Sequence, residues 1–163
     1  MPEVGTIKPL RRQHFNGADS AMPTKGAWKV ALAVVVRDRG PRRDVLIIQR
    51  SDEDGRCPKW VFPGGKVEKQ ESVPHAAQRE LLEETGVVAG EAFVIGKRRH
   101  PVSGVQVHYV GFRAIESEVL DVKDAKVKSA NWIPADKVHD VLGPTLYGRV
   151  ANYISQPEFA LKF

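Results

Sequence analysis

The sequence predicts a single α/β domain, and three observations support that prediction. Two segments rich in β-branched residues, Trp28 to Arg37 and Asp44 to Arg50, are typical of buried strands joined by a turn. Residues Ser72 to Thr85 have the apolar spacing and the end signals of a helix. A chain of 163 residues fits one domain, because that length buries about 70% of its unfolded surface.

Further strands flank the helix. The first two strands are predicted to form a hairpin. A short strand from Trp60 runs into a tight turn at Gly64 and Gly65, where two glycines let the backbone approach a phosphate or a cation. After the helix, Val88 to His100 reads as a strand with a break, and Val105 to Ile115 alternates as another strand.

The predicted helix has clear boundaries. Ser72 can cap its N-terminus, Pro74 is tolerated in its first turn, and Gly86 is a usual C-terminal stop. The residues expected to dock on the sheet are Val73, Ala76, Ala77 and Leu81.

Three carboxylates crowd one side of this helix near its end. On the helical wheel Glu84 lies about 40° from Glu80, and Glu83 lies about 60° from Glu80 on its other side. Acids at a helix C-terminus oppose the macrodipole, and like charges at i,i+4 repel. One interpretation is a solvated acidic face on which Arg79 pairs with Glu83. Binding of a hard divalent cation such as Mg²⁺ better explains all three acids beside a Gly-Gly turn.

The segment from Gly65 to Val87 resembles the Nudix box. That box reads Gly, five residues, Glu, seven residues, Arg-Glu, an aliphatic residue, any residue, Glu-Glu, any residue, Gly and an aliphatic residue. In this chain its fixed places are Gly65, Glu71, Arg79, Glu80, Leu81, Glu83, Glu84, Gly86 and Val87, with no departure. So many constrained positions at fixed spacing make a specific signal.

The resemblance to the Nudix hydrolase family implies an α/β/α sandwich with a mixed β-sheet and a loop–helix–loop active site. The domain is then expected at residues 26–157, with a C-terminal tail at 158–163. Its last elements are expected to be a strand and two helices, at Ser129–Pro134, Asp136–Leu142 and Leu146–Ile154. Residues 1–25 are expected to be an N-terminal extension, which would wrap the domain, contribute to a homodimer contact or be partly disordered.

The resemblance also implies an enzyme, a pyrophosphohydrolase that cleaves a nucleoside diphosphate linked to another moiety. Mg²⁺, with Mn²⁺ as a substitute, is expected to bind the metal ligands Gly65 (through its carbonyl), Glu80, Glu83 and Glu84. Such an ion neutralises phosphates and acidifies the attacking water. Glu83 is the first choice for the catalytic base and Glu80 the second. Arg79 is expected to orient Glu83 or Glu71 through a charge-assisted hydrogen bond.

Basic residues are the candidates for binding the substrate. Strands like the second one often end, in this family, in a basic residue that faces the substrate, and Arg50 holds that position. The alternative interpretation is that Arg50 forms a surface ion pair with Asp52 or Glu53. Lys66 adds positive charge beside the glycine turn. Arg98 belongs to the basic run 97–100, which either contacts a polyphosphate or protects an exposed edge strand from pairing.

One departure from the family concerns the base. Many members carry a Glu just before the Trp-Ile-Pro strand, whereas this chain has Lys126, Lys128, Ser129 and Asn131 there. A base from that loop is therefore in doubt. The other candidates for the base are Glu83, Glu80 and the more distant acids Glu116, Glu118, Asp121 and Asp124.

The composition indicates where the protein is located and what charge its partners carry. The net charge of +5 and pI near 9.4 favour an anionic partner. No apolar run approaches the roughly 20 residues of a membrane span, and no secretory signal is evident. The single Cys57 fits a reducing compartment, so we expect a cytoplasmic protein. No nucleic-acid-binding motif is found, and no serine elbow or zinc-spaced cluster points to another enzyme class.

No motif of a particular Nudix subfamily is evident beyond the box, and the candidate substrates are ranked accordingly. A nucleoside triphosphate, including an oxidised guanine nucleotide, comes first and would give a nucleoside monophosphate and pyrophosphate. ADP-ribose or a sugar nucleotide comes second, and RNA 5′-ends or diadenosine polyphosphates come third. The alternative of another class is a non-catalytic nucleotide-binding sensor module, against which the intact acids argue.

Overall fold

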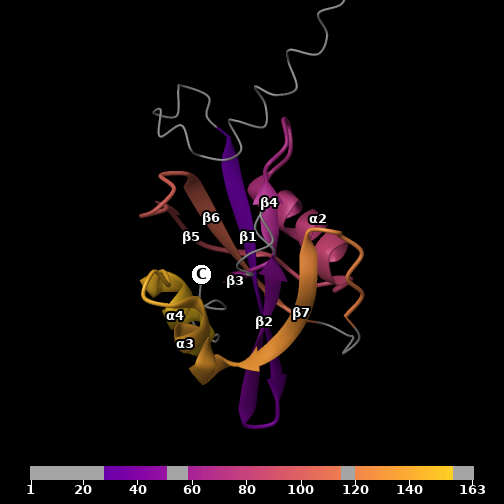
Figure 1. The fold of residues 1–163 in the computed structure, drawn as a ribbon, viewed down its shortest axis with the longest axis vertical. Coiled ribbons are helices and arrows are strands. Elements are labelled where there is room, and N and C mark those ends of the chain that lie inside the picture. Colours follow the sequence, from indigo (N-terminus) through magenta and orange to yellow (C-terminus); the bar gives the residue numbers. More distant parts are fainter. Residues whose placement is uncertain (1–27, 51–58, 115–119, 156–163) are drawn as a thin grey trace, which may run out of the picture.

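A mixed β-sheet covered by helices on both faces forms the domain (Figure 1). The computed structural model describes residues 28–50, 59–114 and 120–155. The strands are β1 (Lys29–Arg39), β2 (Arg42–Arg50), β3 (Lys59–Val61), β4 (Gly64–Lys66), β5 (Phe93–Arg99), β6 (Gln106–Arg113) and β7 (Val127–Pro134). The helices are α2 (Val73–Thr85), the 3₁₀ turn η2 (Ala135–Lys137), α3 (Val138–Leu142) and α4 (Gly148–Ser155).

Several expectations fall outside these ranges. The predicted extension at 1–25 and the tail at 158–163 lie outside the described residues, as do Cys57 and the candidate bases Glu116 and Glu118. Within the described ranges, no helix is long and apolar enough to cross a membrane.

The predicted hairpin of the first two strands is confirmed, but it pairs only near its turn. β1 and β2 are antiparallel from Val36↔Val45 to Arg39↔Arg42. Farther from the turn, β1 pairs with β4 and β2 pairs with β3. The two strands therefore separate, and the segment carrying Gly64 and Gly65 lies in the opening between them. On its other edge β1 runs parallel to β6, and β6 pairs antiparallel with β5.

Alternating side chains of the strands build a core on each face of the sheet. On one face Ala31, Ala33 and Val35 of β1 pack with Ala77 and Leu81 of α2. On the other face the β1 residues Val34 and Val36 pack with α4, through Val150, Tyr153 and Ile154. The expected sandwich of helix, sheet and helix is confirmed.

Helix α2 has the predicted boundaries. The Ser72 hydroxyl accepts a hydrogen bond from the His75 N–H at 3.2 Å. Gly86 ends the helix in the left-handed region, with φ of 74°, and its N–H donates to the Leu82 carbonyl at 2.9 Å.

Two other predicted elements differ in detail. The strand expected from Val88 begins at Phe93, because Ala89 makes only an isolated bridge to Ala114. The helix expected at Asp136–Leu142 forms as a 3₁₀ turn followed by the short α3, which Gly143 ends. Such tight turns are common where a chain leaves a strand for a short helix.

A buried carboxylate holds the base of the hairpin. Asp44 is fully buried and accepts hydrogen bonds from Arg42 Nε at 2.9 Å and from Arg37 Nη2 at 3.2 Å. The Arg37 guanidinium also lies 4.3 Å from the ring centroid of Trp132 in β7. Asp44 thus links the hairpin to the neighbouring strand.

Replacing Asp44 by Asn is expected to lower the free energy of unfolding by about 1–3 kcal/mol, because two arginines lose a charged acceptor in a buried place. Asp38→Asn is the matched control, since Asp38 pairs with Arg43 at an exposed position and such pairs contribute about 0–1 kcal/mol. Urea unfolding of both variants measures the difference. Equal losses would contradict a special role for Asp44.

Candidate active site

The Gly64–Gly65 backbone lies directly against the carboxylates of α2. The Gly64 N–H donates to Glu84 Oε1 at 2.7 Å. A Cβ built on Gly65 would lie 2.6 Å from the Glu80 carboxyl carbon. Only glycine permits so close an approach, so the two glycines fix the distance between β4 and the acidic turn of the helix.

Glu84 is the most constrained of the three acids. It is fully buried, and its Oε2 has no hydrogen-bond partner among the residues that the structure describes. Arg50 Nη2 lies 3.7 Å from Oε2, which is close enough for an ion pair but too long for a hydrogen bond. Burial raises the pKa of Glu84 to about 7, against the opposing effects of the Arg50 charge and the Gly64 N–H. A buried carboxylate oxygen that accepts no hydrogen bond is costly to keep charged, and binding a cation would lower that cost.

Arg79 organises the other carboxylates. Its Nε and Nη2 donate to the two oxygens of Glu71 at 2.8 and 3.1 Å. Its Nη1 donates to Glu80 at 2.9 Å and reaches Glu83 at 3.5 Å. The expected orientation of Glu71 by Arg79 is therefore present as a bidentate contact, and the contact with Glu83 is the longest. These bonds lower the pKa of Glu71 to about 2.

The three acids face different surroundings rather than one shared point. The Glu80 side chain is 16% exposed and that of Glu83 is 56% exposed, whereas Glu84 is buried. Across residues 28–50, 59–114 and 120–155, no group of three or more His, Cys, Asp and Glu is placed to hold a metal. Arg79 occupies the space beside Glu80 and Glu83. The orphaned oxygen of Glu84, with Glu80 against the Gly65 backbone, nevertheless has the donor chemistry of a hard cation site.

The predicted substrate-binding residues lie in different places. Arg50 ends β2 beside Glu84 and so belongs to the site; its alternative partners Asp52 and Glu53 are outside the described residues. Lys66 directly follows the glycines, and its Nζ lies 5.8 Å from the centroid of the Trp28 ring. The roles of both residues in substrate binding stay predictions.

Arg98 is held within the fold. It donates to the Tyr109 hydroxyl at 3.1 and 3.2 Å and to the Thr145 carbonyl. Its guanidinium also lies 5.0 Å from the centroid of the Tyr147 ring. These contacts connect the β5–β6 pair to the segment before α4, which is a structural role beside the predicted one.

Sequence reasoning missed how deeply Glu84 is buried. The signal was present, because Glu84 lies about 20° from Ala77 on the helical wheel, within the apolar stripe. It did not identify the Gly64 N–H as the partner of that carboxylate, since this contact joins two segments that are 20 residues apart.

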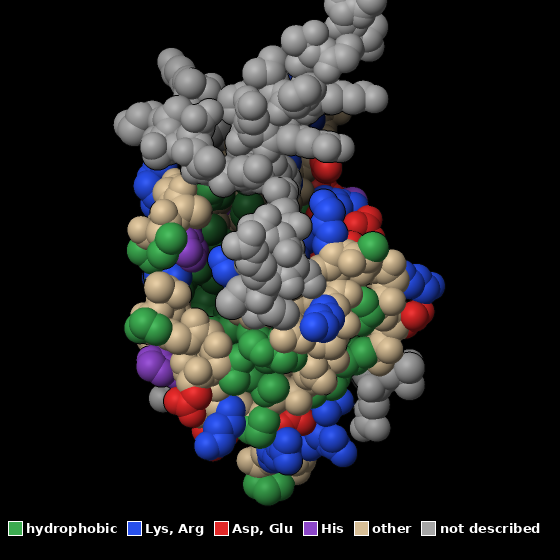
Figure 2. All heavy atoms as spheres, viewed as in Figure 1, with side chains coloured by type: hydrophobic (Ala, Val, Ile, Leu, Met, Phe, Trp, Pro, Cys, Tyr) green, Lys and Arg blue, Asp and Glu red, His purple; other side chains and the backbone are tan. Residues whose placement is uncertain are grey.

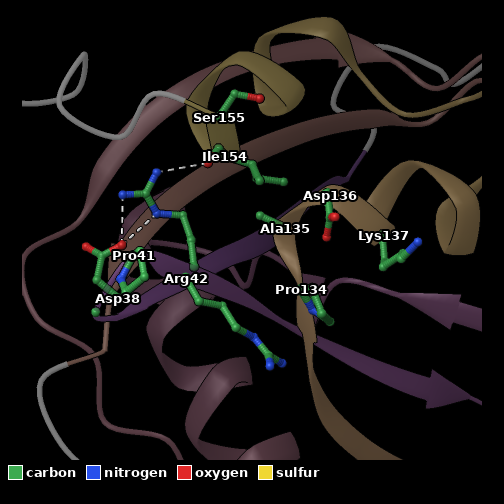
Figure 3. Close-up of a pocket in the computed structure, with 11 residues that line it drawn as sticks. Asp38, Pro41, Arg42, Pro134, Ala135, Asp136, Lys137, Ile154 and Ser155 are labelled. Atoms are coloured by element: carbon green, nitrogen blue, oxygen red, sulfur yellow. Dashed lines mark hydrogen bonds and ion pairs between the residues drawn. The ribbon is translucent and has the colours of Figure 1, made fainter.

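A separate cavity of about 900 Å³ lies at the other end of the sheet (Figure 3). The β1–β2 turn, the start of η2 and the end of α4 line it, and Arg43 bridges Asp38 and the Ile154 carbonyl beside it. Figure 2 shows Lys and Arg side chains gathered at this end of the molecule. Because β1 contacts the glycines near Leu32 and reaches the cavity at Asp38, the two places are about 20 Å apart.

Comparison with known proteins identifies the family. The NUDIX domain model matches residues 27–152, which is most of the chain. The chain belongs to the NUDIX family. The matched range includes the glycine turn and the acids of α2.

Relatives of this NUDIX chain act on nucleotides. A putative 8-oxo-dGTP diphosphatase of Bacillus subtilis (strain 168) is 36% identical over 80 residues, or 49% of this chain and 46% of that protein. The CTP pyrophosphohydrolase of Escherichia coli (strain K12) is 35% identical over 80 residues, or 49% of this chain and 56% of that protein. Both matches thus span about half of the relatives' length.

A solved structure shares the fold. The NUDIX domain of Shewanella oneidensis NrtR, solved in complex with ADP ribose, has a TM-score of 0.63 and 22% identity. The match covers 93% of this chain and 98% of that one.

The Glu71–Arg79 pair predicts how stability depends on pH. The pKa of Glu71 is about 2 in the folded chain and 4.5 without the fold, so the unfolded state binds more protons between these values. The stability that Glu71 contributes is therefore complete above pH 4.5 and is lost as the pH falls toward 2. Urea unfolding of wild type and Glu71→Gln across this range should show their difference shrinking.

Glu91→Gln controls for the loss of a carboxylate, because Glu91 is exposed and forms no ion pair within the described part of the chain. A wild-type advantage over Glu71→Gln that is constant from pH 6 to pH 3 would contradict the assignment.

Proposed function

We propose that this protein hydrolyses a nucleoside triphosphate, including an oxidised guanine nucleotide, to a nucleoside monophosphate and pyrophosphate with the help of Mg²⁺. The observation that carries the proposal is the buried Glu84, with one oxygen held by the Gly64 N–H and the other without a donor. A cation bound there would neutralise the buried carboxylate, and the adjacent Glu80 would supply a second oxygen ligand beside Gly65. The named activities of the two bacterial relatives support the class of substrate.

The surroundings of each acid suggest its role in metal binding or in proton transfer. Glu80, Glu84 and the Gly65 carbonyl would hold Mg²⁺, with Mn²⁺ as a substitute, and Glu83 would complete the set. The ion supplies neutralisation of the phosphates and a more acidic attacking water. Glu83 is the most exposed of the three acids and has the longest contact with Arg79, so its carboxylate has the greatest freedom to accept the proton of that water.

Positively charged side chains orient the anionic substrate. Arg50 already lies beside Glu84, where a guanidinium can donate to a phosphate oxygen and stabilise negative charge as it develops. Lys66 follows the glycine turn and would contribute a second cation. Arg79 keeps Glu80 in place while Glu71 keeps Arg79 in place.

Glu84→Gln is expected to reduce kcat by about 100-fold or more, because the neutral amide cannot hold the cation. The assay measures release of phosphate products from nucleoside triphosphates, 8-oxo-dGTP, ADP-ribose and a diadenosine polyphosphate, with Mg²⁺, with Mn²⁺ and with EDTA. Glu91→Gln, an exposed acid elsewhere, should retain wild-type activity.

The panel also separates the competing functions. Preferential cleavage of ADP-ribose would replace the proposed substrate class with the sugar-nucleotide class. Wild-type protein that binds nucleotides but releases no product with either metal ion would replace the enzyme with a sensor.

Gly65→Ala is expected to lower kcat at least tenfold, since the new methyl group would displace the Glu80 carboxylate. The cost in stability should be about 1–3 kcal/mol, as for other overpacked sites. Gly148→Ala is the matched control, because a Cβ on Gly148 meets nothing within 4 Å. Activity and thermal unfolding are measured for both, and unchanged kcat in Gly65→Ala would exclude the tight contact from the mechanism.

A further inference from the structure

Basic side chains lie in register on the α2 face of the sheet, beyond the acids. Lys97 of β5, His108 of β6, Ala31 of β1 and Gly65 of β4 are successive cross-strand partners. Ala31 packs in the core beneath α2, as does Val110 two residues after His108. Since partners across a sheet share a face, His108 and Lys97 also lie on the α2 face.

Two further cations extend this row. Lys29 precedes Ala31 by two residues and so lies on the same face, and its register partner is Gln106. Arg99 of β5 also pairs with Gln106. Lys29, Lys97 and Arg99 are all exposed. Within the described residues, neither Lys29 nor Lys97 has an ion pair, whereas Arg99 donates to the Gly104 carbonyl at 2.9 Å.

His108 lies among these cations with an unused polar atom. The residue is only 9% exposed, and its Nε2 has no hydrogen-bond partner in the described part of the chain. Burial and then the charges of Lys29 and Lys97 lower the pKa of His108 below its ordinary value. A neutral imidazole can still donate one N–H, and an unpaired buried donor is costly.

This cluster is distinct from the acids of α2. Along the shared row His108 and Gly65 are two strands apart, or about 10 Å at the usual strand spacing. Glu80 lies against Gly65, whereas the like charges around His108 would repel a metal ion. An anion is the ligand that fits the second cluster.

We propose that Lys29, Lys97, Arg99 and His108 form a binding site for a phosphate group, separate from the metal-dependent site. His108 Nε2–H donates to a phosphate oxygen, and the two lysines neutralise its charge through charge-assisted hydrogen bonds. Because the lysine side chains are exposed and flexible, they can close over the anion. Inorganic phosphate, pyrophosphate and a nucleoside monophosphate all carry the required group.

The test titrates the full chain with each of these three anions in EDTA and follows the His108 ring signals by NMR. Wild type should show saturable shifts at His108. Lys29→Gln and Lys97→Gln should each weaken binding about tenfold, the loss expected for one charged hydrogen bond. Lys137→Gln removes the same charge at the far end of the sheet and should bind as wild type does.

Glu84→Gln keeps the two proposals apart, because it should retain this binding while losing metal-dependent activity. A preference for pyrophosphate over the monophosphate would identify a free inorganic anion as the ligand, and equal affinity would identify the phosphate group alone. Either result supports the site. It is overturned if none of the anions shifts His108 at millimolar concentration, or if the variants at Lys29 and Lys97 bind as tightly as Lys137→Gln.

Discussion

The contact between the Gly64–Gly65 backbone and the carboxylates of α2 is the constraint on which the rest of the site depends. It requires an opening in the sheet, which exists because β1 and β2 pair only near their turn. It also requires two residues without side chains, because a Cβ at Gly64 would meet Leu32 and one at Gly65 would meet Glu80. Sheet topology and glycine chemistry together bring main-chain groups against an acidic helix.

The acids differ in charge compensation, and this difference assigns their roles. Glu71 and Glu80 share the Arg79 guanidinium, so each of them has a charged hydrogen-bond donor within the fold, although one positive charge offsets only part of their combined charge. Among the described residues, Glu84 has one hydrogen-bond donor, the Gly64 N–H, and an ion pair with Arg50 at 3.7 Å that is too long for a hydrogen bond. A cation bound there would offset the negative charge of a carboxylate that is buried in a low-dielectric interior. Arg79 of α2 is therefore paired with Glu71, which precedes the helix, whereas Glu84 near the helix end has an oxygen without a hydrogen-bond donor.

The sequence predicted the local features better than the long-range ones. Ser72 and Gly86 mark the ends of a single helix, and both were correctly placed. Arg79 was expected to orient Glu83 or Glu71, and the shorter contacts are those with Glu71. The early separation of β1 and β2 and the packing of Arg98 on Tyr109 and Tyr147 depend on partners far along the chain. No local sequence pattern predicts such contacts. The one local sign that Glu84 is buried is its position close to Ala77 on the helical wheel.

Small residues beneath the helix explain how the acids reach the glycines. Ala31 and Ala33 of β1 face Ala76 and Ala77 of α2, and all four are fully buried. Alanine on both sides lets the helix axis approach the sheet closely, and close-packed interiors leave no slack for larger side chains. A bulkier residue at Ala31 would lift α2 and lengthen the 2.7 Å bond between Gly64 and Glu84. The geometry of the acidic turn thus depends on alanines that take no part in the chemistry.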